Sequence, residues 1–253
     1  MRAVLLVCFL YLAGCSADES VLRMALPKTL KEVSGLAPYG NDLIAIADEK
    51  ARLYRISFDQ ESVTRVGAFG DPPEKGDFEG IALANENVYA ITSDGLLYTK
   101  SLGTPDSEYA VADTQFGELC EIEGLDYMAG LLYVLCKTPY ADELQEHLSI
   151  LVWDPVQQAR VLDQEIRLHW RDLGLPKNKL HPSGMVITAN TLFVIAARER
   201  LWVKVDLGSS AAVVGRLSKS HEQAEGIAIL AGATYIADEG KKRGSVTRYE
   251  GVF

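Results

Sequence analysis

Five short motifs in this sequence place a small or acidic residue directly before a glycine. That residue is a carboxylate in three motifs, Glu79, Glu123 and Glu225, and a serine in two, Ser34 and Ser183. The glycines at 35, 80, 124, 184 and 226 lie 45, 44, 60 and 42 residues apart. Equivalent positions of a repeat come together when the repeats close into a ring, so we expect the three carboxylates to converge near its axis.

A second set of polar residues follows the strand-like run after each motif. Asp48 and Asp238 hold this place in the first and last repeats, and Ser93, Lys137 and Ala197 hold it in the others. Crowded carboxylates repel one another unless a cation, a proton or a basic neighbour compensates. Oxygen ligands of this kind suit calcium. The sequence therefore predicts a divalent-cation site, with calcium as the cofactor, that draws its ligands from Glu79, Glu123, Glu225, Asp48 and Asp238.

A solvated acidic mouth without a metal is the alternative interpretation of these residues. In it, Lys137 and Arg198 serve as internal counter-ions. The sequence contains no aspartate-rich loop with the spacing of an EF-hand, which would have favoured calcium directly.

The elements that position these residues are predicted to be strands. Each motif is followed by two further β-branched or aromatic runs, and periods of roughly 40–50 residues are typical of propeller blades. We therefore predict an all-β, five-bladed β-propeller over residues 21–253. The last repeat lacks a fourth strand, and residues 21–26 can supply it and close the ring. The 60-residue interval predicts an insertion, for which residues 138–148 are the best candidate.

The N-terminus resembles the signal of a bacterial lipoprotein. Arg2 precedes a short apolar run over residues 3–12, which is too short to span a bilayer, and Leu12-Ala13-Gly14-Cys15 is similar to a lipobox. We expect residues 1–14 to be a signal peptide, Cys15 to be lipidated, and residues 15–20 to tether the propeller to a membrane. Ser16 after the cysteine favours the outer membrane, with the protein facing the periplasm. A plain signal peptide with an incidental cysteine is the alternative.

The net charge and the two remaining cysteines indicate which partners are disfavoured and whether a disulfide can form. The formal net charge of −10 disfavours binding to phosphate backbones, so we expect no nucleic-acid partner. Cys120 and Cys136 flank a predicted turn in the third repeat. A cross-strand or diagonal disulfide between them is feasible in an oxidising compartment, and two buried free thiols are the alternative.

A family resemblance is carried by the first two repeats. Ser34-Gly35-Leu36-Ala37, Ala47-Asp48-Glu49 and above all Gly76-Asp77-Phe78-Glu79-Gly80-Ile81-Ala82 resemble the SdiA-regulated family of bacterial propeller proteins. More distantly, the pattern is similar to esterase-like phytase and to strictosidine-synthase and gluconolactonase propellers. The resemblance implies a propeller in the cell envelope and no settled activity. Gluconolactonase-like enzymes hold a divalent ion with Glu, Asn and Asp, and this sequence has no clear counterpart of the Asn ligands.

Two classes of function follow from these features. The first is a membrane-anchored binding or scaffold module with a small-molecule or protein ligand. It is favoured by the predicted anchor and by the lack of a catalytic motif. The second is a metal-dependent hydrolase of an ester, lactone or phosphoester at the channel mouth, in which the predicted cation ligands would be the functional residues. Fold alone does not separate these classes, because propellers host both.

Overall fold

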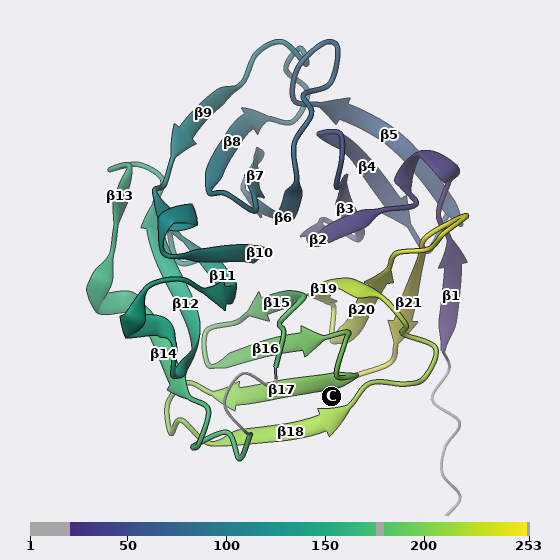
Figure 1. The fold of residues 1–253 in the computed structure, drawn as a ribbon. Helices are drawn as coiled ribbons and strands as arrows, with labels where there is room; N and C mark the ends of the chain where they lie inside the picture. The colour runs from purple at the N-terminus through teal and green to yellow at the C-terminus, as the bar shows by residue number, and fades with distance from the viewer. Residues whose placement is uncertain (1–20, 176–179, 252–253) are drawn as a thin grey trace, which may run out of the picture.

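The computed structural model describes residues 21–175 and 180–251. Over these ranges the chain forms five antiparallel sheets that stand around a central axis (Figure 1). The predicted all-β, five-bladed propeller is confirmed. The predicted signal peptide and tether, including Cys15, lie outside the described residues. No helix in the described ranges is long and apolar enough to cross a membrane.

The first two blades each contain four strands that run in sequence order from the axis to the rim. Blade one contains β2 (Val33–Tyr39), β3 (Asp42–Ala47), β4 (Arg52–Ser57) and β5 (Ser62–Ala68). Blade two contains β6 (Phe78–Ala84), β7 (Asn87–Thr92), β8 (Leu96–Ser101) and β9 (Ala110–Asp113).

Blades three and four continue the ring. Blade three contains β10 (Cys120–Met128), β11 (Leu131–Pro139) and β12 (His147–Asp154), and both β13 (Ala159–Arg160) and β14 (Ile166–His169) pair with β12. Blade four contains β15 (Gly184–Ile187), β16 (Thr191–Ala196), β17 (Leu201–Asp206) and β18 (Ala212–Arg216). The connections include four short 3-10 helices, η1 (Lys28–Leu30), η2 (Phe116–Glu118), η3 (Asp142–Leu144) and η4 (Leu162–Gln164).

Blade five closes the ring by joining the two ends of the described chain. Its strands are β19 (Ala224–Leu230), β20 (Ala233–Asp238) and β21 (Ser245–Tyr249), and β1 (Leu22–Ala25) is the fourth. β1 is antiparallel to β21, with Leu22 opposite Arg248 and Ala25 opposite Ser245. The predicted closing strand is therefore confirmed, and it satisfies the backbone groups that β21 would otherwise leave open at its outer edge.

The hydrophobic core is divided among the spaces between neighbouring blades. One cluster lies between blades five and one, and it includes Leu26, Leu36 and Tyr235. Four more clusters fill the spaces between the other pairs of blades. Each sheet is therefore buried on both faces, which explains why the inner strands read as nearly continuous apolar runs rather than as an alternation.

The extra residues of blade three do not all lie where the sequence predicted the insertion. We expected it at residues 138–148, but β11 continues to Pro139 and β12 begins at His147, so only the middle of that range is a loop. The other extra residues lie farther on, in the segment with η4 and in the connection to β15. The prediction relied on polarity, and polar residues also fit the exposed ends of long strands.

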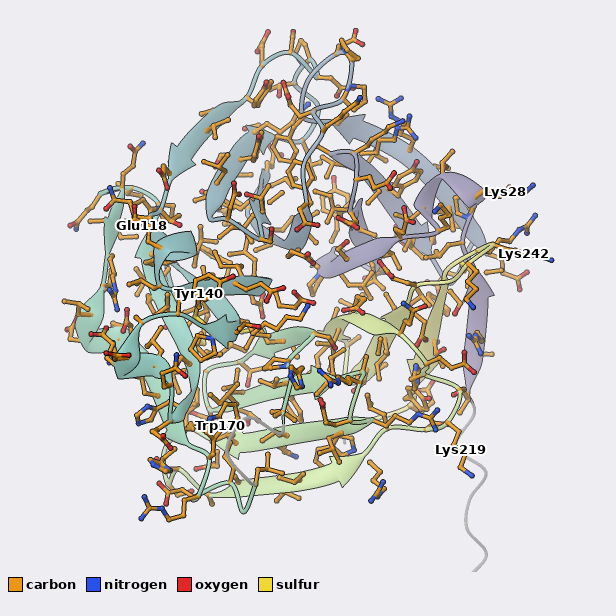
Figure 2. The ribbon with its side chains drawn as sticks, in the orientation of Figure 1. Lys28, Glu118, Tyr140, Trp170, Lys219 and Lys242 are labelled. Carbon is orange, nitrogen blue, oxygen red and sulfur yellow. A yellow bond between two sulfur atoms is a disulfide. The ribbon has the colours of Figure 1, made fainter. Side chains whose placement is uncertain are left out.

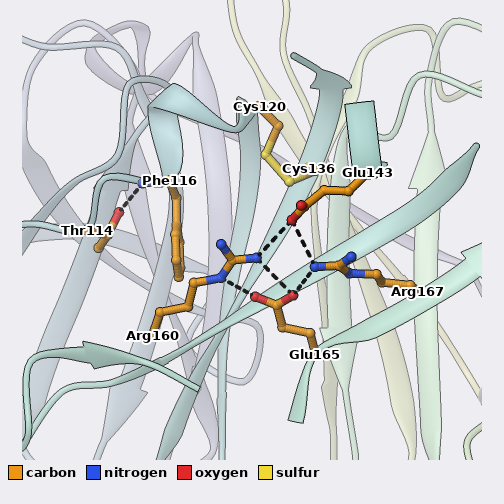
Figure 3. A network of polar contacts seen from close by, with 8 residues as sticks. All are labelled: Thr114, Phe116, Cys120, Cys136, Glu143, Arg160, Glu165 and Arg167. Atoms are coloured by element: carbon orange, nitrogen blue, oxygen red, sulfur yellow. Dashed lines mark hydrogen bonds and ion pairs between the residues drawn. A yellow bond between two sulfur atoms is a disulfide. The ribbon is translucent and has the colours of Figure 1, made fainter. Parts of the chain in front are cut away.

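An ion-pair network stabilises the outer edge of blade three, where β13 and β14 both pair with β12 (Figure 3). The Glu165 carboxylate is almost fully buried and accepts hydrogen bonds from Arg160 Nε at 2.5 Å and from Arg167 Nη2 at 2.8 Å. Glu143 lies 3.2 Å from the same Arg167 nitrogen. The Arg160 guanidinium also lies over the Phe116 ring, which ties this edge to η2, in the connection from blade two to blade three.

Cys120 and Cys136 form a disulfide between β10 and β11. The two residues are not direct partners, because Cys120 lies opposite Pro139 and Cys136 lies opposite Ile122. The register shift between them brings their Cα atoms to 5.6 Å, within the usual range for a disulfide. A diagonal bridge of this kind was one of the two alternatives that the sequence left open.

Candidate functional site

One end of the ring gathers the beginning of each innermost strand and the end of each second strand. The register places Val33 opposite Ala47, Phe78 opposite Thr92, and Ala224 opposite Asp238. The residues before the motif glycines therefore share one mouth of the propeller with the residues that follow the second strands. We call this end the acidic mouth, defined by Asp48, Asp77, Glu79, Glu123, Glu225 and Glu239.

A β-bulge aims the glutamates of the motifs toward the axis. In blade two, Phe78 pairs with Thr92 and Gly80 pairs with Ile91, so Glu79 has no partner in the ladder. Glu225 and Ser34 occupy the same unpaired position in their blades, and Glu123 lies within the irregular part of β10. Bulges often redirect side chains next to functional sites. The glycine that follows lets neighbouring inner strands approach closely, since a Cβ on Gly80 would lie 2.5 Å from Leu125 N.

Three carboxylates of the acidic mouth come together as a candidate cation site. Asp48, Asp77 and Glu79 each offer one oxygen, and these oxygens lie within 4.8 Å of one another. Two of the predicted ligands, Asp48 and Glu79, belong to this cluster. Asp77 was not among the predicted ligands, although it belongs to the Gly76–Ala82 motif that carries the family resemblance and lies two residues before Glu79.

The backbone holds Asp77 in this position from two sides. The Ser93 amide donates to the Asp77 carbonyl at 2.8 Å, and the Phe78 amide donates to the Asp48 carbonyl at 3.2 Å. The Ser93 hydroxyl donates to Asp77 Oδ2 at 2.6 Å, which orients the carboxylate. The loop before β6 is thereby attached to the ends of both β3 and β7, and Asp77 faces the neighbouring blade.

Burial and mutual repulsion raise the pKa values of the clustered carboxyl groups. Burial, and then the charges of Glu123 and Asp77, raise the pKa of Glu79 to about 9. Burial, and then the charge and hydrogen bond of Asp77, raise the pKa of Asp48 to about 7. Both groups thus retain protons at a pH where an ordinary carboxyl group is ionised. A bound cation would reverse this balance, because it stabilises the ionised forms.

Several buried oxygens near this mouth have no hydrogen-bond partner in the described chain. They are Ser34 Oγ, Asp48 Oδ1 and Glu123 Oε2. Ser34 is 4% exposed, and together with Glu79 and Glu225 it lines the narrow central space. A buried polar atom without a partner costs roughly 1–3 kcal/mol. A cation held by the Asp48, Asp77 and Glu79 cluster would give Asp48 a partner, and this oxygen-only donor set fits calcium, which accepts six to eight oxygens in a flexible geometry.

The other predicted ligands have different immediate partners. Glu123 Oε1 accepts a hydrogen bond from Lys137 Nζ at 2.8 Å, so Lys137 serves as a counter-ion. Asp238 Oδ2 lies 2.8 Å from His221 Nδ1, both residues are buried, and Asp238 is not part of the Asp48 cluster. Glu225 lines the central space, and burial followed by the charge of Glu123 raises its pKa to about 8.

The second expected counter-ion does not reach the cluster. The Arg198 guanidinium is largely exposed and lies 3.8 Å from Glu199. Lys137 is engaged by Glu123 and also lies 3.5 Å from Glu121. Burial disfavours the Lys137 ammonium, but its hydrogen bond and ion pair with Glu123 outweigh this and raise its pKa. Among the described residues, no basic side chain forms an ion pair with Asp48, Asp77 or Glu79.

Comparisons with known proteins support the fold and do not identify a family. No protein-family model matches the sequence, and no curated protein matches it either. Among solved structures, a glutaminyl cyclase from Myxococcus xanthus is similar, with 16% identity, a TM-score of 0.60, and coverage of 92% of this chain and 96% of that chain. At these identities the likeness shows the fold alone. The SdiA-regulated resemblance therefore stays a prediction.

Two further enzymes have comparable folds. The PQQ-bound aldose sugar dehydrogenase from Streptomyces coelicolor is 14% identical, with a TM-score of 0.60 over 91% of this chain and 98% of that chain. A luciferin-regenerating enzyme is 8% identical, with a TM-score of 0.57 over 92% and 96% of the two chains. The chain is thus a β-propeller whose structural neighbours include enzymes.

Proposed function

We propose that this protein is a lipid-anchored β-propeller of the bacterial cell envelope that binds a divalent cation at its acidic mouth. Calcium fits the oxygen-only donor set best. The observation that carries the proposal is the Asp48, Asp77 and Glu79 cluster, with which no basic side chain of the described ranges forms an ion pair. The bound cation would present open coordination positions to a small-molecule or protein ligand. A place in the SdiA-regulated family, on the outer membrane and facing the periplasm, accords with the motif resemblance and the lipobox.

Direct titration with calcium tests the cation site. After removal of metal with a chelator, calorimetry of the processed chain at pH 8 should show one calcium ion bound. Glu79→Gln and Asp48→Asn should each weaken binding at least about tenfold, or about 1.4 kcal/mol, because each removes a charged ligand. Glu49→Gln is the matched control, since it removes one exposed charge beside Asp48 and no ligand. An equal loss in this control, or no binding to the parent chain, would contradict the proposal.

Hydrolysis is the second candidate function, and Glu225 is the observation that favours it. Its raised pKa keeps a proton on this carboxyl group near neutral pH, and it lines the central space together with Glu79. A protonated carboxyl group beside a cation can serve as a general acid. An ester, lactone and phosphoester panel separates the two functions. Calcium-dependent turnover that is lost in Glu225→Gln favours hydrolysis, and calcium binding without turnover favours the binding module.

The predicted anchor is tested by substitution of its cysteine. Cys15→Ser should block lipidation and release the protein from the membrane fraction, or stop its processing, because acylation of this residue supplies the attachment. Fractionation of cells that express the parent chain or the variant is the measurement. A variant that fractionates and migrates like the parent chain would rule out the lipobox.

A further inference from the structure

The closure of the ring brings together two segments of unusual charge. Residues 21–31 and 240–249 contain seven of the 25 Lys and Arg residues and none of the 35 Asp and Glu residues. The whole chain has a net charge of −10, so these two segments are positively charged in a protein that is negatively charged overall. They lie far apart in sequence, and the pairing of β1 with β21 makes them neighbours.

Backbone contacts extend this pairing beyond the two strands. The Leu26 amide donates to the Gly244 carbonyl at 2.9 Å, and the Gly240 amide donates to the Lys31 carbonyl at 3.0 Å. The loop after β1 therefore lies against the loop before β21. We call the resulting surface the basic edge, and it consists of Arg23, Lys28, Lys31, Lys241, Lys242 and Arg243.

The charges of the basic edge are mostly uncompensated. Lys31 forms an ion pair with Glu32, and Arg23 donates to the Ser245 hydroxyl at 2.9 and 3.0 Å. Among the described residues, no carboxylate pairs with the other four side chains, which are exposed. Five of the six line a surface hollow of about 770 Å³ whose described lining holds no carboxylate. Lys28 and Lys31 also line a second hollow beside it, where Glu32 and Glu49 are the acidic neighbours. Like charges held together in this way favour an anionic partner.

The place of the basic edge relative to the predicted anchor points to a particular partner. Cys15 precedes Leu22 by seven residues, which extend at most about 24 Å. β1 carries the chain about 10 Å farther, toward Lys28. A chain held at a bilayer by Cys15 can therefore rest its basic edge on the same surface. Val21 and Leu22, at the start of β1, are 50% and 49% exposed and add apolar contact at this place.

We propose that the basic edge docks on the anionic phosphate groups of the phospholipids in the membrane that holds the anchor, and so orients the propeller. Lys28 and Lys242 point away from the axis at one side of the ring (Figure 2). Docking through this side leaves the acidic mouth open to the periplasm, where its own charge is not pressed against the bilayer. The inference rests on the proposed anchor, and it is independent of the cation site.

Sedimentation with lipid vesicles tests the docking surface without the anchor. The protein is the processed chain, residues 15–253, with Cys15→Ser so that no acyl group is attached. It should bind vesicles made of equal parts phosphatidylglycerol and phosphatidylcholine at low ionic strength, and it should not bind vesicles of phosphatidylcholine alone. Each basic residue near an anionic surface contributes about fivefold to binding, so removal of four should lower it by about a hundredfold or more.

Two variants with the same change of net charge make the test specific. Lys28→Glu, Lys241→Glu, Lys242→Glu and Arg243→Glu together should abolish vesicle binding. The control combines four exposed basic residues of other blades and connections, changed to Glu: Lys75, Arg171, Arg198 and Arg200. The control should keep most of the binding, because its charges are distant from the contact and screened.

Three outcomes would overturn the docking proposal. They are equal binding to neutral and anionic vesicles, equal losses in the two variants, and displacement by soluble glycerophosphate at the same phosphate concentration. None of these outcomes would contradict the proposed function. Calcium titration of the same protein tests the cation site separately, and fractionation of the acylated protein tests the anchor separately.

Discussion

In the presence of a chelator, the free energy of unfolding should fall as the pH rises from about 5 to 9. Glu79, Glu225 and Asp48 have pKa values of about 9, 8 and 7 in the folded protein, above the ordinary values of 4.5 for Glu and 3.8 for Asp. The folded state thus binds more protons than the unfolded state between these limits. The stabilisation that these three groups contribute is fully present below their unfolded pKa values, and it is lost as the pH rises through their folded pKa values. We expect a loss on the order of 3 kcal/mol, after allowance for partial exposure.

Calcium should remove most of this loss. A ligand that binds only the folded state adds about 2.7 kcal/mol of stability at a hundredfold excess over its Kd, which raises the Tm by about 5–10 °C for a chain of this size. The gain should be largest near pH 8–9 and small near pH 5, where protons compete for the same oxygens. Thermal unfolding across this pH range, with calcium or with chelator, is the measurement.

Glu79→Gln tests whether Glu79 causes the pH dependence of stability and the response to calcium. Its amide does not titrate and carries no charge, so it should reduce both the pH slope in chelator and the response to calcium. The control Glu49→Gln should keep both. The assignment would be wrong if the parent chain were most stable near pH 9 in chelator, or if Glu79→Gln kept the full slope.

Gly80→Ala should be among the most destabilising single substitutions in the inner ring. The added Cβ would lie 2.5 Å from Leu125 N and 2.8 Å from Leu125 Cβ, and contacts below 3.0 Å to backbone require the strands to separate. Overpacking in a closely packed core typically costs about 1–3 kcal/mol, and a clash with backbone should cost about 3 kcal/mol or more. The Tm should fall by at least about 6 °C, or the protein should be recovered only as aggregate.

Gly124→Ala is the matched control at the equivalent position of blade three. Its Cβ would meet Leu135 Cβ at 3.3 Å, which is a side-chain contact that small shifts relieve. We expect this variant to fold and to lose less than about 1.5 kcal/mol. Calorimetric unfolding of the two proteins decides the matter. Equal Tm values for the two variants would show that close approach of β6 and β10 is not the reason for the glycine.

The candidate site was predictable where it depends on the repeat and was missed where it depends on loops. Asp48 and Glu79 occupy repeating positions, and both belong to the carboxylate cluster. Asp77 lies outside the repeat, and it joins the cluster because Ser93 and the β3 end hold its loop. Asp238 occupies a repeating position, but His221, on the loop before β19, is its immediate partner. A position in a repeat predicts which mouth a side chain faces, and it does not predict its partner.

The sequence alone determined the number of blades, the mouth that carries the carboxylates, and the strand that closes the ring. Strands within a blade pair over short distances along the chain, so their order follows from local spacing and strand preference. Only the tertiary structure decided which carboxylates come together in one cluster, how Cys120 reaches Cys136 across a register shift, and that two segments from the ends of the described chain form one basic edge. Those contacts join residues of different blades, loops or chain ends, and their geometry is set by the rotation between neighbouring sheets and by closure of the ring.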